Sequence, residues 1–218
     1  MSPLLANVLL DEVDKELSRR GHAFARYADD CNVYVRSKRS GNRVMALLRR
    51  LYARLRLRIN EDKSAVAPAT QRQFLGFGLW VGVGKAVKHR VSSRALVRMK
   101  DRIRQLTRRT RGRSLAQIAQ DLRAYLVGWK NYFKLAVTPR VFRDLDQWIR
   151  HRLRAVQLRQ WRRGSTIYRE LRARGMSVSG ATRVACNGRR WWRNSAKLLH
   201  VALPNSLFDE LGVPRLAT

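Results

Sequence analysis

Two adjacent carboxylates, Asp29 and Asp30, are the residues of this sequence best suited to catalytic chemistry. They follow Tyr27-Ala28, where two short apolar strands are expected to turn back on each other. Adjacent carboxylates repel each other, and Mg²⁺ removes that penalty because it takes oxygen ligands and bridges to phosphates. Phosphoryl transfer with two metal ions uses such carboxylates. Because Asp-Asp is also ordinary turn chemistry, the pair alone leaves both interpretations open.

Arginine is the second residue type that suggests a binding chemistry. The sequence has 38 Arg and 9 Lys, and the guanidinium fork binds phosphate in a bidentate way that an ammonium cannot. A codon bias toward arginine is the alternative explanation. Candidate phosphate contacts lie on or beside the exposed sides of two predicted helices: Arg98, Arg102, Arg108, Arg109 and Arg111 on one, and Arg140, Arg143, Arg150, Arg152, Arg154 and Arg159 on the other. We predict that they bind RNA and are not merely solvated.

The composition also indicates a nucleic-acid partner. Of 218 residues, 47 are Lys or Arg and 15 are Asp or Glu, which gives a formal net charge of +32. The 45% of hydrophobic residues exclude a disordered basic tail. The sequence has neither a run of ~18 apolar residues nor a signal-peptide pattern, and its two cysteines suit a reducing compartment. We therefore expect a cytoplasmic, bacterial-type protein associated with RNA or the nucleoid and with no membrane partner.

The aromatic residues of the second half fall into two groups. Three of them recur at core spacing within predicted helices and are expected to pack: Trp129, Phe133 and Trp148. Three others lie among arginines: Trp161, Trp191 and Trp192. Stacking on exposed bases is possible chemistry for the second group, and core packing is the alternative.

The elements expected to position Asp29 and Asp30 alternate between helix and strand. A helix begins at Ser2-Pro3 and ends at Gly21. The expected elements after it are two strands joined by a tight turn within 23–36, a helix capped by Asn42 and reaching Leu55, a short strand at 57–59, a strand over 73–80, a turn at 82–84 and a returning strand over 86–91.

The second part of the sequence is predicted to be helical. Ser92 or Ser93 caps a first helix, Ser114-Leu115-Ala116-Gln117 is a capping box, and Thr138-Pro139 begins another helix. Short helices are expected over 167–174 and 196–203. Residues 1–91 carry a net charge of +10 and residues 92–218 a net charge of +22. We therefore predict two domains, 1–91 and 92–218, with the boundary near Val91-Ser92.

Several motifs in order resemble a known family. Ser2–Leu10, Phe24–Asp30, Leu57–Ser64 and Phe74–Phe77 resemble the second half of a reverse transcriptase palm, in particular that of reverse transcriptase/maturases encoded by group II introns. Tyr125–Phe133 resembles the maturase-specific domain, also called X or thumb, of the same family. The resemblance implies an α+β fold: a partial palm, an antiparallel sheet with helices, followed by an α-helical thumb.

The resemblance also implies roles for individual residues. Asp29 and Asp30 match the metal-binding catalytic pair, and Tyr27 stands where the family has a tyrosine or phenylalanine that lines the site. Lys63 matches a lysine proposed as a proton donor to pyrophosphate, although a solvated lysine is the alternative.

The stretch around Phe74 and Gly76 matches the primer-grip hairpin of the family. Gly76 would let backbone approach backbone or ligand, and a glycine that merely packs in a sheet is the alternative.

The implied activity is RNA-directed DNA synthesis, a nucleotidyl transfer with Mg²⁺ and dNTPs on an RNA template and DNA primer, together with intron RNA binding and splicing. The family's palm also carries an earlier metal-binding Asp, which this sequence from Met1 onward does not show. We therefore expect the chain to need an N-terminal half, in the same reading frame or from another chain, and to be inactive by itself. Two alternatives remain open: a non-catalytic RNA-binding splicing cofactor and an inert remnant of a mobile element.

Overall fold

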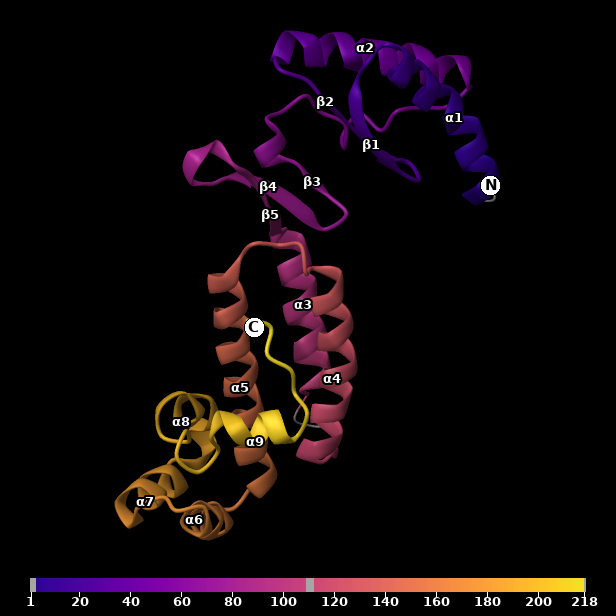
Figure 1. Cartoon of the computed structure of the whole chain (residues 1–218). Coiled ribbons are helices and arrows are strands. Elements are labelled where there is room, and N and C mark those ends of the chain that lie inside the picture. Colours follow the sequence, from indigo (N-terminus) through magenta and orange to yellow (C-terminus); the bar gives the residue numbers. More distant parts are fainter. Residues whose placement is uncertain (1–2, 109–111, 218) are drawn as a thin grey trace. The chain divides into compact units, whose positions relative to one another are not determined.

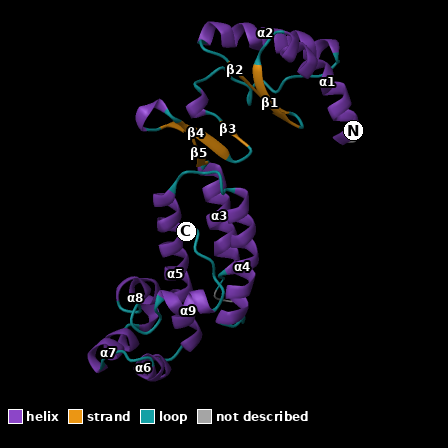
Figure 2. Cartoon of the chain, viewed as in Figure 1, coloured by secondary structure: helices purple, strands orange, loops and turns teal. Residues whose placement is uncertain are grey.

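The computed structural model describes residues 3–108 and 112–217 and divides the chain into two compact units, Met1–His89 and Arg90–Thr218 (Figure 1). Helices dominate both units, and short antiparallel sheets accompany them (Figure 2). The predicted α+β class is confirmed. None of the helices within the described ranges combines the length and the apolar character that crossing a membrane requires.

The first unit opens with two helices packed on a β-hairpin. Its elements are α1 (Pro3–Arg19), β1 (Ala23–Tyr27), β2 (Asp30–Tyr34) and α2 (Lys38–Arg54). Strands β1 and β2 pair antiparallel with Tyr27 opposite Asp30, so Ala28 and Asp29 form a two-residue loop. The buried cluster beneath the hairpin consists of Leu10, Val13, Leu17 and Leu47. The hairpin predicted within 23–36 is therefore confirmed.

Helix α2 begins earlier than the sequence predicted. The Ser37 side chain accepts a hydrogen bond from the backbone N–H of Ser40 at 3.2 Å and caps the helix, so the predicted cap, Asn42, lies inside it. Gly41, which precedes the predicted cap, is buried within the helix. A Cβ at this position would lie 2.4 Å from Cγ1 of Val66, so the glycine lets the later loop pack closely.

The strand predicted over 57–59 is wrong. After α2, the chain turns through Arg56, whose φ is 55°, and the backbone N–H of Leu57 donates to the carbonyl of Tyr52 at 2.8 Å. The segment therefore uses its backbone to end the helix, while Leu57 packs on the core of the unit.

A second sheet follows in the order β3-β4-β5. Its strands and 3-10 helices are η1 (Ala69–Gln71), β3 (Gln73–Phe74), β4 (Phe77–Val81), η2 (Val83–Lys85) and β5 (Val87–Val91). The single strand predicted over 73–80 is in fact a hairpin, because Leu75 and Gly76 both have positive φ, 50° and 77°, and form a two-residue turn. The predicted return at 86–91 is confirmed.

Three long helices lie side by side in the second unit (Figure 1). They are α3 (Ser93–Leu106), α4 (Leu115–Tyr132) and α5 (Pro139–Trp161). The predicted starts are confirmed: Ser92 accepts from the backbone of Ala95, Ser114 and Gln117 form a reciprocal capping box, and a proline opens α5.

Shorter helices complete the second unit. They are α6 (Gly164–Ala173), α7 (Val178–Cys186), η3 (Gly188–Arg190), α8 (Trp191–Lys197) and α9 (Asn205–Glu210). The helix predicted over 167–174 is confirmed within α6, whereas that over 196–203 is wrong and α7 was not predicted. After α8, the carbonyl of Leu203 accepts a hydrogen bond from Arg154 Nε at 2.8 Å, a tertiary contact that the local sequence pattern does not show.

The C-terminal segment returns along the long helices (Figure 1). The Asp146 carboxylate accepts the backbone N–H groups of Leu216 and Ala217 at 3.0 Å, and Lys130 Nζ donates to the carbonyl of Arg215 at 2.9 Å. These contacts hold the last described residues against α4 and α5.

Candidate active site and nucleic-acid interface

The hairpin loop presents the carboxylate pair to solvent. Asp29 lies in the two-residue loop and Asp30 begins β2, and both residues are exposed. Ala28 has a φ of 53°, a left-handed conformation that costs a non-glycine residue about 1–3 kcal/mol. Such strain persists only where the surroundings determine the backbone. Tyr27, which pairs with Asp30, is 64% exposed beside the two acids.

Arg26 ties this loop to α1. Its Nε lies 2.9 Å from both Asp14 carboxylate oxygens, and its Nη1 donates to Asn7 Oδ1 at 2.9 Å and to the carbonyl of Ala28 at 3.1 Å. The hydrogen bond with Asp14 raises the pKa of Arg26. The guanidinium thus fixes the loop carbonyl directly before Asp29.

Sequence reasoning missed Arg26, although a signal was present. Side chains two apart on a strand share a face, so Arg26 lies on the same face as Phe24, which packs on the core cluster. A charged residue at a core-facing strand position needs a buried partner, and Asp14, one of the few acids on the opening helix, supplies it.

Two ionisable groups beneath the hairpin, Cys31 and Tyr52, are half-buried. Burial raises the pKa of the Cys31 thiol and that of the Tyr52 hydroxyl, and the Asp29 charge adds to the rise at Tyr52. A thiol with a raised pKa is a poor nucleophile at neutral pH. The chemistry of this face therefore rests on the exposed carboxylates.

The two carboxylates of the hairpin are oxygen donors, which suit a hard divalent cation. They are only two, and no group of three or more His, Cys, Asp or Glu side chains within residues 3–108 and 112–217 could hold a metal ion without further ligands. Mg²⁺ usually keeps several waters and binds through one or two protein carboxylates plus substrate phosphates. Asp29 and Asp30 fit that requirement in number and chemistry.

The other predicted palm residues lie on separate elements. Lys63 is exposed in the loop after α2, where its backbone N–H bonds to Asn60 and its carbonyl accepts from Arg72 Nη2 at 2.9 Å. Phe74 and Gly76 belong to the β3–β4 hairpin, where Phe74 is half-buried opposite Phe77. The structure therefore brings Tyr27, Asp29 and Asp30 together on the β1–β2 hairpin, and Phe74 and Gly76 together on the β3–β4 hairpin.

Six of the arginines predicted to contact RNA are exposed on the second unit. They are Arg98 and Arg102 on α3, Arg108 just after it, and Arg140, Arg143 and Arg159 on α5. Arg102 also donates to Gln105 at 3.2 Å within its own helix. Arg109 and Arg111 lie outside the described residues.

The prediction that Arg150 and Arg154 lie on the exposed side of α5 is wrong. Their relative exposures are 3% and 2%. Arg150 Nη2 donates to Asp209 at 2.7 Å. Arg154 donates to the carbonyl of Leu203 and to Asn205 Oδ1. Burial, and then the Arg150 charge, lower the pKa of Arg154 to about 10. These two side chains join α5 to the C-terminal helix instead of facing a ligand.

The packing of this helix corrects the prediction for Arg152 and decides between the two alternatives for Trp161. Arg152, half-buried, donates from Nε to Thr107 Oγ1 at 2.9 Å and lies 5.3 Å over the Trp148 ring. Trp161 is only 9% exposed, with the Arg174 guanidinium 5.1 Å over its ring, so it packs in the core and offers no open face for a base.

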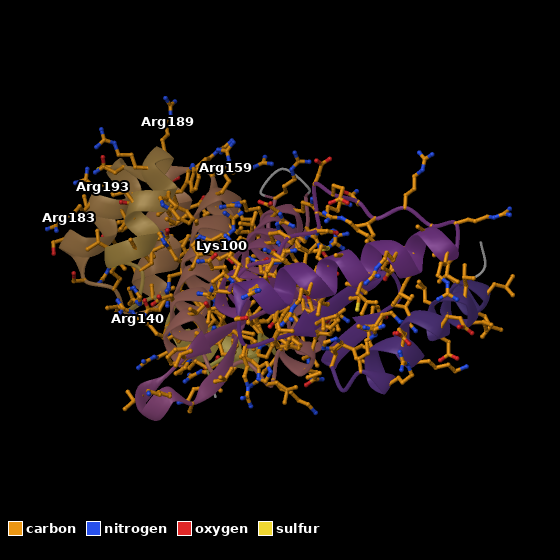
Figure 3. The ribbon with its side chains drawn as sticks, turned by 90° about the horizontal axis from the view of Figure 1, so that it is seen from above. Lys100, Arg140, Arg159, Arg183, Arg189 and Arg193 are labelled. Carbon is orange, nitrogen blue, oxygen red and sulfur yellow. The ribbon has the colours of Figure 1, made fainter. Side chains whose placement is uncertain are left out.

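Sequence reasoning missed a set of exposed arginines on the C-terminal helices. Arg183 lies on α7, Arg189 on η3 and Arg193 on α8, and all three point outward from this part of the unit (Figure 3). The signal was the sequence between Glu170 and Asp209, which contains six arginines and one lysine but no acid. An unbalanced segment of this kind marks a polyanion-binding surface.

Comparisons with known proteins agree with these features. The family model described as reverse transcriptase (RNA-dependent DNA polymerase) matches residues 1–79, and that described as group II intron, maturase-specific domain matches residues 96–175. No curated protein sequence matches the chain. The first match contains the carboxylate hairpin and the β3–β4 turn, and the second contains the three long helices apart from the first residues of α3. The chain therefore belongs to the group II intron reverse transcriptase/maturase family.

Proposed function

We propose that this chain supplies Asp29 and Asp30 as Mg²⁺ ligands for RNA-directed DNA synthesis and that it binds intron RNA through the exposed arginines of its second unit. In this proposal Met1–His89 is palm and Arg90–Thr218 is the maturase thumb. A purely RNA-binding cofactor and an inert remnant are not favoured, because family models for both domains match the chain.

The observation that carries the catalytic part is the hairpin loop itself. Two carboxylates stand exposed on a loop whose backbone is strained at Ala28 and held by Arg26. A bound divalent ion would neutralise phosphate charge on the nucleotide and the primer end. Asp29 and Asp30 would hold that ion, Tyr27 would line the site beside them, and dNTPs, RNA template and DNA primer would be the substrates.

The remaining palm residues would act from neighbouring segments. Lys63 would hold a proton at Nζ for the departing pyrophosphate, and its exposure in the loop after α2 leaves the ammonium accessible. Phe74 and Gly76 would contact the primer at the tight β3–β4 turn, where Gly76 has a φ of 77° and no side chain that would keep a ligand away from the backbone.

RNA binding rests on exposed charge that the chain does not neutralise internally. The RNA-contacting set is Arg98, Arg102, Arg108, Arg140 and Arg143, with Arg109 predicted from sequence. Residues 92–218 contain 29 basic and 7 acidic side chains. Most of those acids already bind arginine or backbone within the unit. The surplus positive charge is available to phosphates.

Metal binding and RNA binding are tested separately on the same chain. Asp29→Asn and Asp30→Asn are compared with Asp144→Asn, which removes an exposed carboxylate of the second unit. Mn²⁺ is the probe, and its paramagnetic broadening of backbone NMR signals is followed over residues 27–32. We expect broadening that both hairpin variants lose and the control keeps, with RNA affinity unchanged in all three.

Unchanged broadening in the hairpin variants would contradict the metal assignment. Primer extension gives a second readout, because any extension activity of the protein must disappear in Asp29→Asn and Asp30→Asn. Extension that survives in either variant would also remove these residues from the catalytic role.

A further inference from the structure

A small cavity lies between α5 and α8, away from the hairpin. It has a volume of about 210 Å³ and is half-open to solvent. Its lining consists of Thr107, Arg152, Ala155, Val156, Trp191 and Trp192. Two indoles, two aliphatic side chains, one guanidinium and one hydroxyl therefore surround a space that a flat, partly polar group can enter.

The aromatic wall of the cavity is held in place by α5. The His151 ring stacks on Trp192 with 3.9 Å between the ring centroids and an interplanar angle of 29°, and His151 Nε2 lies 2.9 Å from the carbonyl of Trp192. Ser195 Oγ donates to that same carbonyl at 2.7 Å. Trp191 meets Trp192 edge to face at 6.2 Å. Both indoles are thus oriented before any ligand arrives.

The polar wall is fixed as well. Arg152 Nε donates to Thr107 Oγ1, which itself donates to the carbonyl of Ile103 at 2.6 Å. The guanidinium also lies over Trp148. A pre-ordered arginine fork loses less entropy when it binds a further acceptor.

The surroundings of the cavity are strongly basic. Arg159 lies on α5 and the outward-pointing Arg193 on α8, which form the cavity, and the outward-pointing Arg189 lies on η3, which contacts both helices (Figure 3). No Asp or Glu occurs between Glu170 and Asp209 to compensate them. The charge therefore favours a polyanion over an apolar protein partner.

We propose that this cavity takes one unpaired base of an RNA strand, while the surrounding arginines bind the adjacent phosphates. The inference rests on the proposed RNA-binding function and assigns it a second contact site. The cavity is smaller than the ~300–1,000 Å³ of pockets for drug-sized ligands, so it suits a single ring system. Every base has a face that can stack on an indole, and unpaired nucleotides are what RNA-binding proteins usually read. The maturase-specific match ends at residue 175, before Trp191 and Trp192.

The experiment compares single-stranded with fully paired RNA. Trp191→Leu removes the aromatic plane, Trp191→Phe keeps one, and Tyr168→Ala on α6 is the control for an exposed aromatic outside the cavity. The probes are a five-nucleotide uridylate strand and a blunt RNA duplex. We expect Trp191→Leu to bind the single strand about tenfold more weakly and the duplex within about twofold of the unchanged protein. Trp191→Phe should keep most of the affinity, and Tyr168→Ala should change nothing.

A measurement on the unchanged protein protects the test against misfolded variants. A 2-aminopurine at the centre of the uridylate strand should lose fluorescence on binding, because stacking on an indole quenches it. Undiminished fluorescence in the complex, or equal affinity losses of Trp191→Leu for both RNAs, would overturn the cavity as a base site while leaving the arginine surface intact. If the unchanged protein binds neither RNA, the proposed RNA-binding function fails and the cavity proposal falls with it.

Discussion

The two units of this chain support their functional residues in different ways. In the first unit, within the described residues, few apolar side chains are buried: Leu10, Val13, Leu17, Val44 and Leu47. The second unit buries several times as many, along α3, α4, α5 and the C-terminal helices. The loop that carries Asp29 is therefore held by a polar clamp, the ion pair of Arg26 with Asp14. The basic helices of the second unit are instead held together by an extensive apolar core.

Arginine side chains have different roles in the two units, depending on whether they are buried or exposed. Arg26, Arg150 and Arg154 are drawn inward to bind acids, amides and carbonyls, whereas Arg98 and Arg143 stay in water. A buried arginine therefore links elements of the fold, whereas an exposed arginine is accessible to a phosphate. Net charge predicts the class of partner, but burial decides which arginines are accessible to that partner.

The largest expected effect on stability comes from removing a buried arginine that links two parts of the second unit. Arg154→Ala deletes the bonds to Leu203 and Asn205 and leaves a cavity, so we expect a loss of about 3–5 kcal/mol in the free energy of unfolding. Arg143→Ala, on the exposed face of the same helix, should change stability by less than about 0.5 kcal/mol. Urea unfolding of both variants measures the contrast, and equal stabilities would break the distinction between buried and exposed arginines.

The next effect concerns the polar clamp of the first unit. Arg26→Lys keeps the charge but cannot bond Asp14 and Ala28 together with a planar fork, so we expect it to lose about 1.5–3 kcal/mol of local stability. The measurement is amide hydrogen exchange across residues 27–32, which should accelerate. Arg39→Lys, exposed at the start of α2, is the matched control. Unchanged exchange in Arg26→Lys would mean that the loop conformation needs no clamp.

Sequence reasoning succeeded where structure is local. Ser92 and the Ser114–Gln117 box cap helices through residues three positions away, and the Asp29-Asp30 hairpin closes over two residues. It failed where partners are distant. Arg154 meets Leu203 and Asn205 about fifty residues later.

Proximity in space explains the remaining errors. Position 41 of the helix is a glycine because Val66 packs where a side chain would lie. The cavity between α5 and α8 joins segments that no local pattern connects. Charge, most helix caps and motif order could therefore be predicted from the sequence, whereas the division of the arginines into buried and exposed ones could not.

The pH dependence of stability also differs between the two units, and we expect this effect to be smaller. Hydrogen bonds from Arg215 and Arg150 hold the pKa of the Asp209 carboxyl below its ordinary value of 3.8. A lowered pKa stabilises the fold above the unfolded value, and that contribution is lost as pH falls through the folded one. We expect the free energy of unfolding of the second unit to fall as the pH drops from about 5 to below 3.8.

Asp209→Asn should be less stable at pH 7 and should show a flatter acid dependence. The pKa of Glu16 on α1 is also lowered, to about 2, by Arg19 and Arg20, but both arginines lie exposed on the helix surface, and surface pairs contribute little. Glu16→Gln is therefore the control, and it should leave the pH profile unchanged. A profile altered by Glu16→Gln and not by Asp209→Asn would reverse the comparison.

The last variant should leave the stability of the fold unchanged and should alter only RNA binding. Arg140→Ala with Arg143→Ala removes two exposed guanidinium groups from α5, so stability should stay constant while the dependence of RNA affinity on salt flattens. Each phosphate of single-stranded RNA that the protein no longer neutralises lowers the slope of log K against log salt by about 0.7, so the double variant should reduce it by about 1.4. The measurement is RNA affinity over a range of salt concentrations, with Arg39→Ala as the control. A slope that does not change would show that these arginines are solvated, because counterion release depends on phosphate binding and not on net charge alone.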